Sequence, residues 1–174
     1  MHQVLGIQKS LIFIQIFNRM FGFSHFIDNE ACGSAHGTEK HGLTEFGKQV
    51  VKRVKELNMI VDLAHTSRKS FFDILKITKD VPVIVSHTGV QGTCPGTRNL
   101  DDEQIKAIAK TKGVIGIAYF KNAICGNFEP KDIVKAISYV AKLVGVDHVS
   151  LGSDFDGAGN SKKFFYSIFP FSNN

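Results

Sequence analysis

The chain has few cysteines and no long apolar run, and these two absences argue against a small disulfide-held fold and against a membrane span. Three cysteines, Cys32, Cys94 and Cys125, in 174 residues are too few, and odd in number, for a small fold held by disulfides. The apolar stretch 11–17 is far shorter than the roughly 20 residues that cross a bilayer, so we expect a core helix there. The stretch 164–171 is equally short and contains a proline. Neither stretch predicts a membrane span.

The chain also lacks a block of basic residues. Its 21 lysines and arginines against 16 acidic residues give a formal net charge of +5, but they are spread along the sequence, so we expect no nucleic acid partner. With 43% hydrophobic and 21% charged residues, the composition predicts a single globular domain over 1–174. No signal peptide or anchor is recognisable, which favours the cytoplasm while leaving the compartment open.

Strand-like and helix-like segments alternate along the chain, as they do around a parallel sheet. The predicted strands cover 20–25, 59–65, 81–87, 114–119 and 149–154. Four helices are predicted from capping or first-turn residues, namely Thr44, Ser67, the pair Asp101 and Gln104, and Pro130. The sequence therefore predicts an α/β fold of about five βα units.

Three predicted strands end in residues that can bind a metal, namely His65, His87 and Asp154. Active sites of (β/α) barrels are built from the carboxyl ends of strands. Imidazole and carboxylate groups are ordinary zinc ligands. About one helix, one strand and their turns separate His65 from His87, so neighbouring strands would bring both to one metal. The pattern predicts a zinc site of His65, His87 and Asp154, although each histidine alone also fits a hydrogen-bonded structural role.

Longer motifs carry a resemblance to a known family. They are, in order, Phe23-Ser-His25-Phe, Gly42-Leu-Thr-Glu-Phe-Gly47, Asp62-Leu-Ala-His65-Thr-Ser67, Ser86-His87, Arg98-Asn99-Leu-Asp101-Asp-Glu103 and Gly152-Ser-Asp154-Phe-Asp156-Gly157. Together they resemble the membrane dipeptidase (renal dipeptidase) family of zinc peptidases, family M19. The resemblance runs from about residue 20 to 157 and implies a TIM-type (β/α) barrel, present here only in part.

The resemblance also implies a reaction and a set of roles. The family hydrolyses the peptide bond of dipeptides with metal-activated water at a two-zinc site. His65 and His87 would bind the second zinc, and Asp154 would belong to the first zinc, contact the substrate and transfer protons. His25 would contact the scissile peptide group and its tetrahedral intermediate. Arg98 would hold the substrate's C-terminal carboxylate, which suits a planar guanidinium.

The sequence departs from the family pattern at both ends. The family's His-x-Asp pair for the first zinc and its bridging glutamate lie upstream of the matching segment, and neither is found here. After Gly157 the match fades into a divergent tail, 158–174. We therefore expect a chain truncated at both ends, whose open sheet edges leave room for a homo-oligomer. The alternative function is a catalytically inactive fragment that binds at most one zinc, through His65 and His87.

A few further residues receive mainly structural interpretations. Asp62 alternates away from the predicted pocket, and we expect it to support the site rather than bind metal. His36, His41 and His148 lie in predicted loops or at a strand start and are assigned no chemistry. Cys94 and Cys125 lie close to a cysteine pair that some extracellular family members bridge, a pair that would stay reduced in a cytoplasm.

Overall fold

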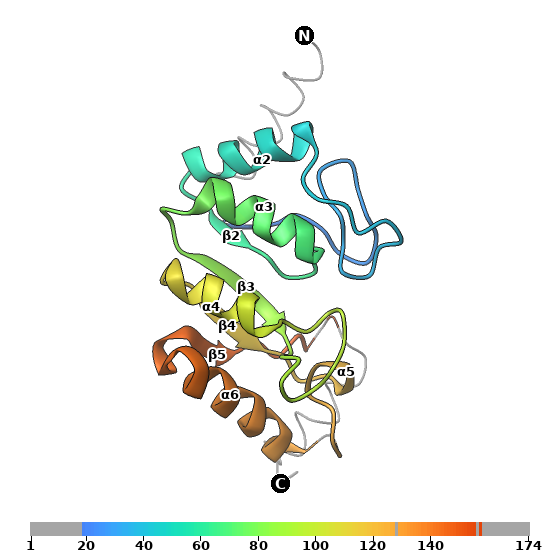
Figure 1. Cartoon of the computed structure of the whole chain (residues 1–174), viewed down its shortest axis with the longest axis vertical. Coiled ribbons are helices and arrows are strands. Elements are labelled where there is room, and N and C mark those ends of the chain that lie inside the picture. The colour runs from blue at the N-terminus through green and yellow to red at the C-terminus, as the bar shows by residue number, and fades with distance from the viewer. Residues whose placement is uncertain (1–18, 128, 156, 158–174) are drawn as a thin grey trace, which may run out of the picture. The chain divides into compact units, whose positions relative to one another are not determined.

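The computed structural model describes residues 19–127, 129–155 and 157, in which helices and parallel strands alternate (Figure 1). The chain falls into two compact units, Met1–Lys79 and Asp80–Asn174. The helix predicted over 11–17 and the tail 158–174 lie outside the described residues. Across the described ranges, no helix has both the length and the apolar character needed to span a membrane.

Over residues 19–79, the first unit pairs two strands in parallel and packs two helices with them. β1 (Met20–Gly22) aligns with β2 (Ile60–Asp62), and the helices are α2 (Glu45–Glu56) and α3 (Arg68–Thr78). The predicted caps are confirmed, since the side chains of Thr44 and Ser67 accept the backbone N–H groups of Gly47 and Ser70. The fully buried side chains of this unit include Val51, Val54, Val61, Leu63, Phe71 and Ile74.

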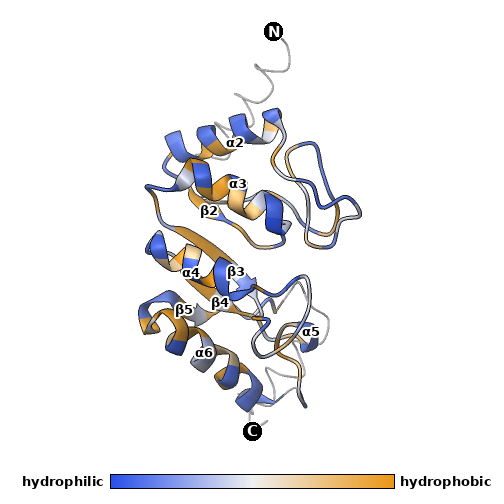
Figure 2. Cartoon of the chain, in the orientation of Figure 1, coloured by the Kyte–Doolittle hydropathy of each residue, from blue (hydrophilic) through white to orange (hydrophobic). Residues whose placement is uncertain are grey.

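Among its described residues, the second unit contains three parallel strands, β3 (Val83–Thr88), β4 (Val114–Ile117) and β5 (Val149–Leu151). Its helices are α4 (Asp102–Lys110), α5 (Lys121–Ile124) and α6 (Pro130–Val144), followed by the 3-10 turn η1 (Val146–His148). Figure 2 shows β3 and β4 as mostly hydrophobic and α4 and α6 as mixed. This pattern fits buried strands under amphipathic helices. The short helix α5 is not predicted from the sequence.

Four of the predicted strands end earlier than the sequence suggests, and β4 is one of them, since it stops at Ile117 and not at Tyr119. β1 stops at Gly22, β2 at Asp62 and β5 at Leu151, so His25, His65 and Asp154 lie in the loops that follow. His65 and Asp154 have φ angles of 65° and 58°, and a left-handed residue cannot continue a strand ladder. β3 differs, because it includes His87 and ends at Thr88.

Removing the cap of α4 is expected to destabilise the second unit. The Asp101 carboxylate accepts the Gln104 N–H at 2.8 Å, and the Gln104 side chain accepts the Asp101 N–H at 3.2 Å. The change Asp101→Ala removes the carboxylate half of this capping box and should cost about 1 kcal/mol, measured by denaturant unfolding. Asp101→Asn keeps an acceptor at the cap and is the matched control. Equal destabilisation by both variants would contradict the capping explanation.

Candidate active site

A group of aromatic and histidine rings lies in the loops that follow β1 and β2 in the first unit. The His25 and His65 ring centroids lie 4.5 Å apart, and the Phe26 ring is 4.1 Å from that of His25. His36 joins the group, with its ring 5.6 Å from His65 and 5.3 Å from Phe26. His65 is buried, whereas His25, Phe26 and His36 are exposed. The structure thus brings together His25 and His65, both predicted, and adds Phe26 and His36.

Backbone hydrogen bonds explain why His36 joins this group. The Ser34 hydroxyl donates to the His25 carbonyl and accepts the His36 N–H at 3.1 Å. The next residue, Ala35, donates its N–H to the His65 carbonyl at 2.7 Å. The segment 34–36 is therefore fastened to the backbones of both predicted site histidines. No local sequence pattern reveals this, because His36 is eleven positions from His25 in an irregular loop.

The carboxylate of Asp28 organises the loop that carries the segment 34–36. It accepts the backbone N–H groups of Ser34 at 2.7 Å, Glu39 at 2.9 Å and Lys40 at 3.4 Å. The Ser34 bond is the main reason that the pKa of Asp28 lies below its ordinary value, because these donors favour the charged carboxylate. Asp28 thus holds in place the loop that carries His36.

Two predicted site residues of the second unit are linked directly. The Arg98 guanidinium donates through Nη2 to the backbone carbonyl of His87 at 2.7 Å. The His87 ring has Nδ1 2.9 Å from the Ser86 hydroxyl, a contact that can set the ring's orientation and tautomer. The structure therefore places a permanent positive charge beside the strand end that carries His87.

Two glycines allow the strand end that carries Asp154 to approach β3. Gly116 on β4 and Gly152 after β5 each face the Ser86 carbonyl so closely that a side chain at either position would overlap that oxygen. Ser86 precedes His87, and Gly152 lies two residues before Asp154. The close approach therefore draws together the segments that carry His87 and Asp154.

The residue types fit zinc, but the described residues do not assemble a complete site. Imidazole nitrogens and a carboxylate are donors that zinc accepts. Within the described ranges, no cluster of three or more histidine, cysteine or acidic side chains is arranged to hold a metal ion. The predicted metal roles of His65, His87 and Asp154 stay predictions. Asp62 is buried and accepts the Ala64 N–H at 3.0 Å, which shapes the turn before His65.

The structure joins Cys94 and Cys125 in a disulfide, with their Cα atoms 5.3 Å apart. The sequence leaves this pairing open, and a cytoplasmic location implies free thiols. Such bonds persist mainly in oxidising compartments. Cys32 forms no disulfide; it is fully buried, and burial raises the pKa of its thiol, which makes it an inert core residue.

Comparison with known proteins identifies the family. The model of the membrane dipeptidases, peptidase family M19, matches residues 13–166. The chain belongs to this family. Among curated relatives, it is 37% identical over 123 residues to an uncharacterized protein in the pqqA 5′ region of Klebsiella pneumoniae, covering 67% of this chain and 45% of that one. It is 31% identical over 170 residues to dipeptidase aclJ of Aspergillus oryzae, covering 94% and 40%.

Solved structures agree with the M19 assignment. The dipeptidase AC, an M19 metallopeptidase, matches with a TM-score of 0.77 and 26% identity, covering 86% of this chain and 46% of that one. A metallopeptidase of Rhodobacter sphaeroides, liganded with a phosphinate mimic of the dipeptide L-Ala-D-Ala, matches with a TM-score of 0.73, 26% identity and the same coverage. The predicted family and the partial TIM-type α/β fold are confirmed. The chain spans less than half the length of each of these four relatives.

Proposed function

We propose that this chain carries part of the active site of a zinc-dependent dipeptidase. The observation that supports this most directly is the bond from Arg98 to the His87 carbonyl. It fixes a cation beside a histidine that can bind metal. A dipeptide has a carboxylate one residue from its scissile bond, so a cation held near a metal would select short peptides with a free C-terminus.

Each candidate residue has a defined task in this proposal. His65, His87 and Asp154 would hold zinc, which would lower the pKa of bound water and polarise a carbonyl group. Asp154 takes a proton from the attacking water and returns it to the leaving amine. His25, whose ring packs against that of His65, donates a hydrogen bond to the oxyanion that forms during attack. Arg98 binds the substrate carboxylate through its planar fork.

A second candidate function is an inactive chain that binds at most one zinc. One observation favours it, since the described residues contain no cluster of three or more histidine, cysteine or acidic side chains arranged for a metal. In this case His65 and His87 would bind zinc weakly and no hydrolysis would follow.

Turnover of a dipeptide by the full chain separates the two functions. The purified chain is loaded with zinc, and release of free amino acids from L-Ala-D-Ala is followed by mass spectrometry. The first proposal expects hydrolysis that stops when a chelator removes zinc and resumes when zinc is returned. Folded, zinc-loaded chain without turnover would reject the active enzyme. Two tightly held zinc ions per chain would reject the weak single-zinc alternative.

A further inference from the structure

We propose that Asn99 is a positioning residue that holds Arg98 in place for binding the substrate carboxylate. This inference rests on the role proposed above for Arg98. Asn99 follows Arg98 in the sequence motif, and the motif assigns it no function. In the structure, Asn99 is 2% exposed, whereas Arg98 is half-buried. Of these two adjacent residues, Asn99 is therefore anchored in the protein, and Arg98 stays partly accessible.

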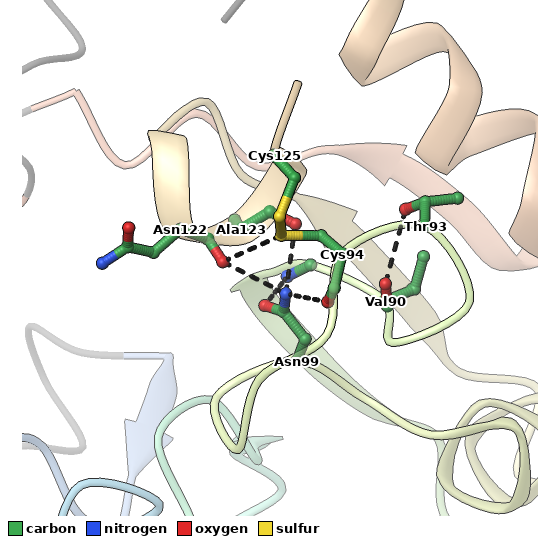
Figure 3. Close-up of a disulfide and its surroundings, with 8 residues drawn as sticks. Val90, Thr93, Cys94, Asn99, Asn122, Ala123 and Cys125 are labelled. Atoms are coloured by element: carbon green, nitrogen blue, oxygen red, sulfur yellow. Dashed lines mark hydrogen bonds between the residues drawn. A yellow bond between two sulfur atoms is a disulfide. The ribbon is translucent and has the colours of Figure 1, made fainter. Parts of the chain in front are cut away.

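The carboxamide of Asn99 connects three segments that lie far apart in the sequence (Figure 3). Its Nδ2 group points at the backbone carbonyls of Cys94 at 2.7 Å, Asn122 at 3.1 Å and Ala123 at 3.3 Å. Its Oδ1 atom accepts the Gly89 N–H at 3.1 Å. Both ends of the side chain are therefore satisfied, which a buried amide requires and which fixes its orientation.

These bonds set Arg98 in register with the end of β3. The Leu100 N–H donates to the Gly89 carbonyl at 3.0 Å, and the Thr88 hydroxyl donates to the Arg98 carbonyl at 3.1 Å. Together with the bond from the Gly89 N–H to Asn99 Oδ1, these two bonds hold residues 98–100 against residues 88–89, immediately after His87. The Arg98 guanidinium then reaches the His87 carbonyl. Asn99 thus fixes the backbone from which Arg98 reaches that carbonyl.

The Cys94–Cys125 disulfide cross-links two of the segments that Asn99 contacts. Cys94 and Cys125 tie the loop before Arg98 to the end of α5, and Figure 3 shows Asn99 beside this bond. The carbonyls that Asn99 contacts belong to Cys94 and to two residues of α5. The Nδ2 group of Asn99 therefore contacts two segments that the disulfide cross-links, while its Oδ1 atom binds the Gly89 N–H next to β3.

A measurement on Arg98 itself tests the positioning without any turnover. In 15N-labelled full chain, NMR relaxation of the Arg98 Nε–H group reports how ordered this side chain is. We expect Asn99→Ala to lower its order parameter toward the values below about 0.6 of flexible groups. The control Lys121→Ala, at an exposed position on α5, should leave it unchanged. An equally ordered Arg98 in Asn99→Ala would overturn the proposal.

A second variant keeps the test decisive if Asn99→Ala does not fold. Asn99→Asp preserves the shape of the side chain and its acceptor for the Gly89 N–H, but it turns a carboxylate oxygen toward the three carbonyls that Nδ2 contacts. Because that end can no longer donate, Arg98 should also lose order in this variant. Arg98 that stays as ordered in Asn99→Asp as in the unmodified chain would contradict the positioning role.

Substrate discrimination adds a readout that a purely structural role would not change. A dipeptide and its C-terminal amide differ only at the group that Arg98 is proposed to bind. We expect Asn99→Ala to reduce the preference for the free acid, as a ratio of kcat/KM values, by about tenfold, through KM more than kcat. An unchanged preference in an active variant would overturn the proposal. If the unmodified chain hydrolyses neither compound, the dipeptidase proposal fails, and the order of Arg98 still decides the role of Asn99.

Discussion

His87→Ala is expected to abolish dipeptide hydrolysis and to lower the zinc content of the purified chain. Loss of an outer hydrogen-bond partner of a metal ligand typically costs about 10–100-fold in metal affinity or activity, and loss of the ligand itself should cost more. Zinc content is measured by atomic absorption, and hydrolysis by release of amino acids. The fold should survive, because His87 contributes to β3 through its backbone.

The corresponding substitution at His65 must be one that tolerates the backbone conformation at this position. His65 has a φ of 65°, a left-handed conformation that asparagine tolerates better than most residues. His65→Asn removes the imidazole with little added strain and should match His87→Ala in zinc loss and inactivity. His148→Ala is the control, since His148 Nδ1 lies 2.9 Å from the Gly113 carbonyl and carries no proposed chemistry. Full zinc content and full activity in either ligand variant would remove that histidine from the site.

The change Asp154→Asn is expected to lower kcat for dipeptide hydrolysis by about 10²–10⁴-fold, the usual contribution of a positioned acid or base. Asparagine tolerates the φ of 58° at this position and has nearly the same shape, but it neither takes up nor returns a proton. Unfolding by denaturant should therefore change little. Asp147→Asn, at an exposed position in η1, is the control.

Zinc content divides the two roles proposed for Asp154. If Asp154→Asn loses activity together with zinc, the carboxylate acts mainly as a ligand. If it loses activity and keeps zinc, the carboxylate acts mainly in proton transfer. A variant that keeps both its zinc and its kcat would show that Asp154 performs neither task in this chain.

The sequence predicts the elements of this fold well, because local rules govern them. Thr44 and Asp101 bond to backbone groups three residues away, so capping patterns reveal where α2 and α4 begin. The ends of strands are predicted less well. A histidine after an apolar run looks the same whether it lies in the strand, as His87 does, or in a left-handed turn beyond it, as His65 does. Backbone conformation there depends on the loop that packs against it.

By itself, the sequence determined the family, the α/β alternation and the residue types offered at the strand ends, since these follow from ordered motifs and periodicity. Only the tertiary structure placed His36 beside His65, joined Cys94 to Cys125 and connected Asn99 to Gly89 and to α5. These features depend on contacts between segments distant along the chain. Hydrogen bonds across such distances leave no periodic trace in the sequence, because they form only after the strands and helices have packed.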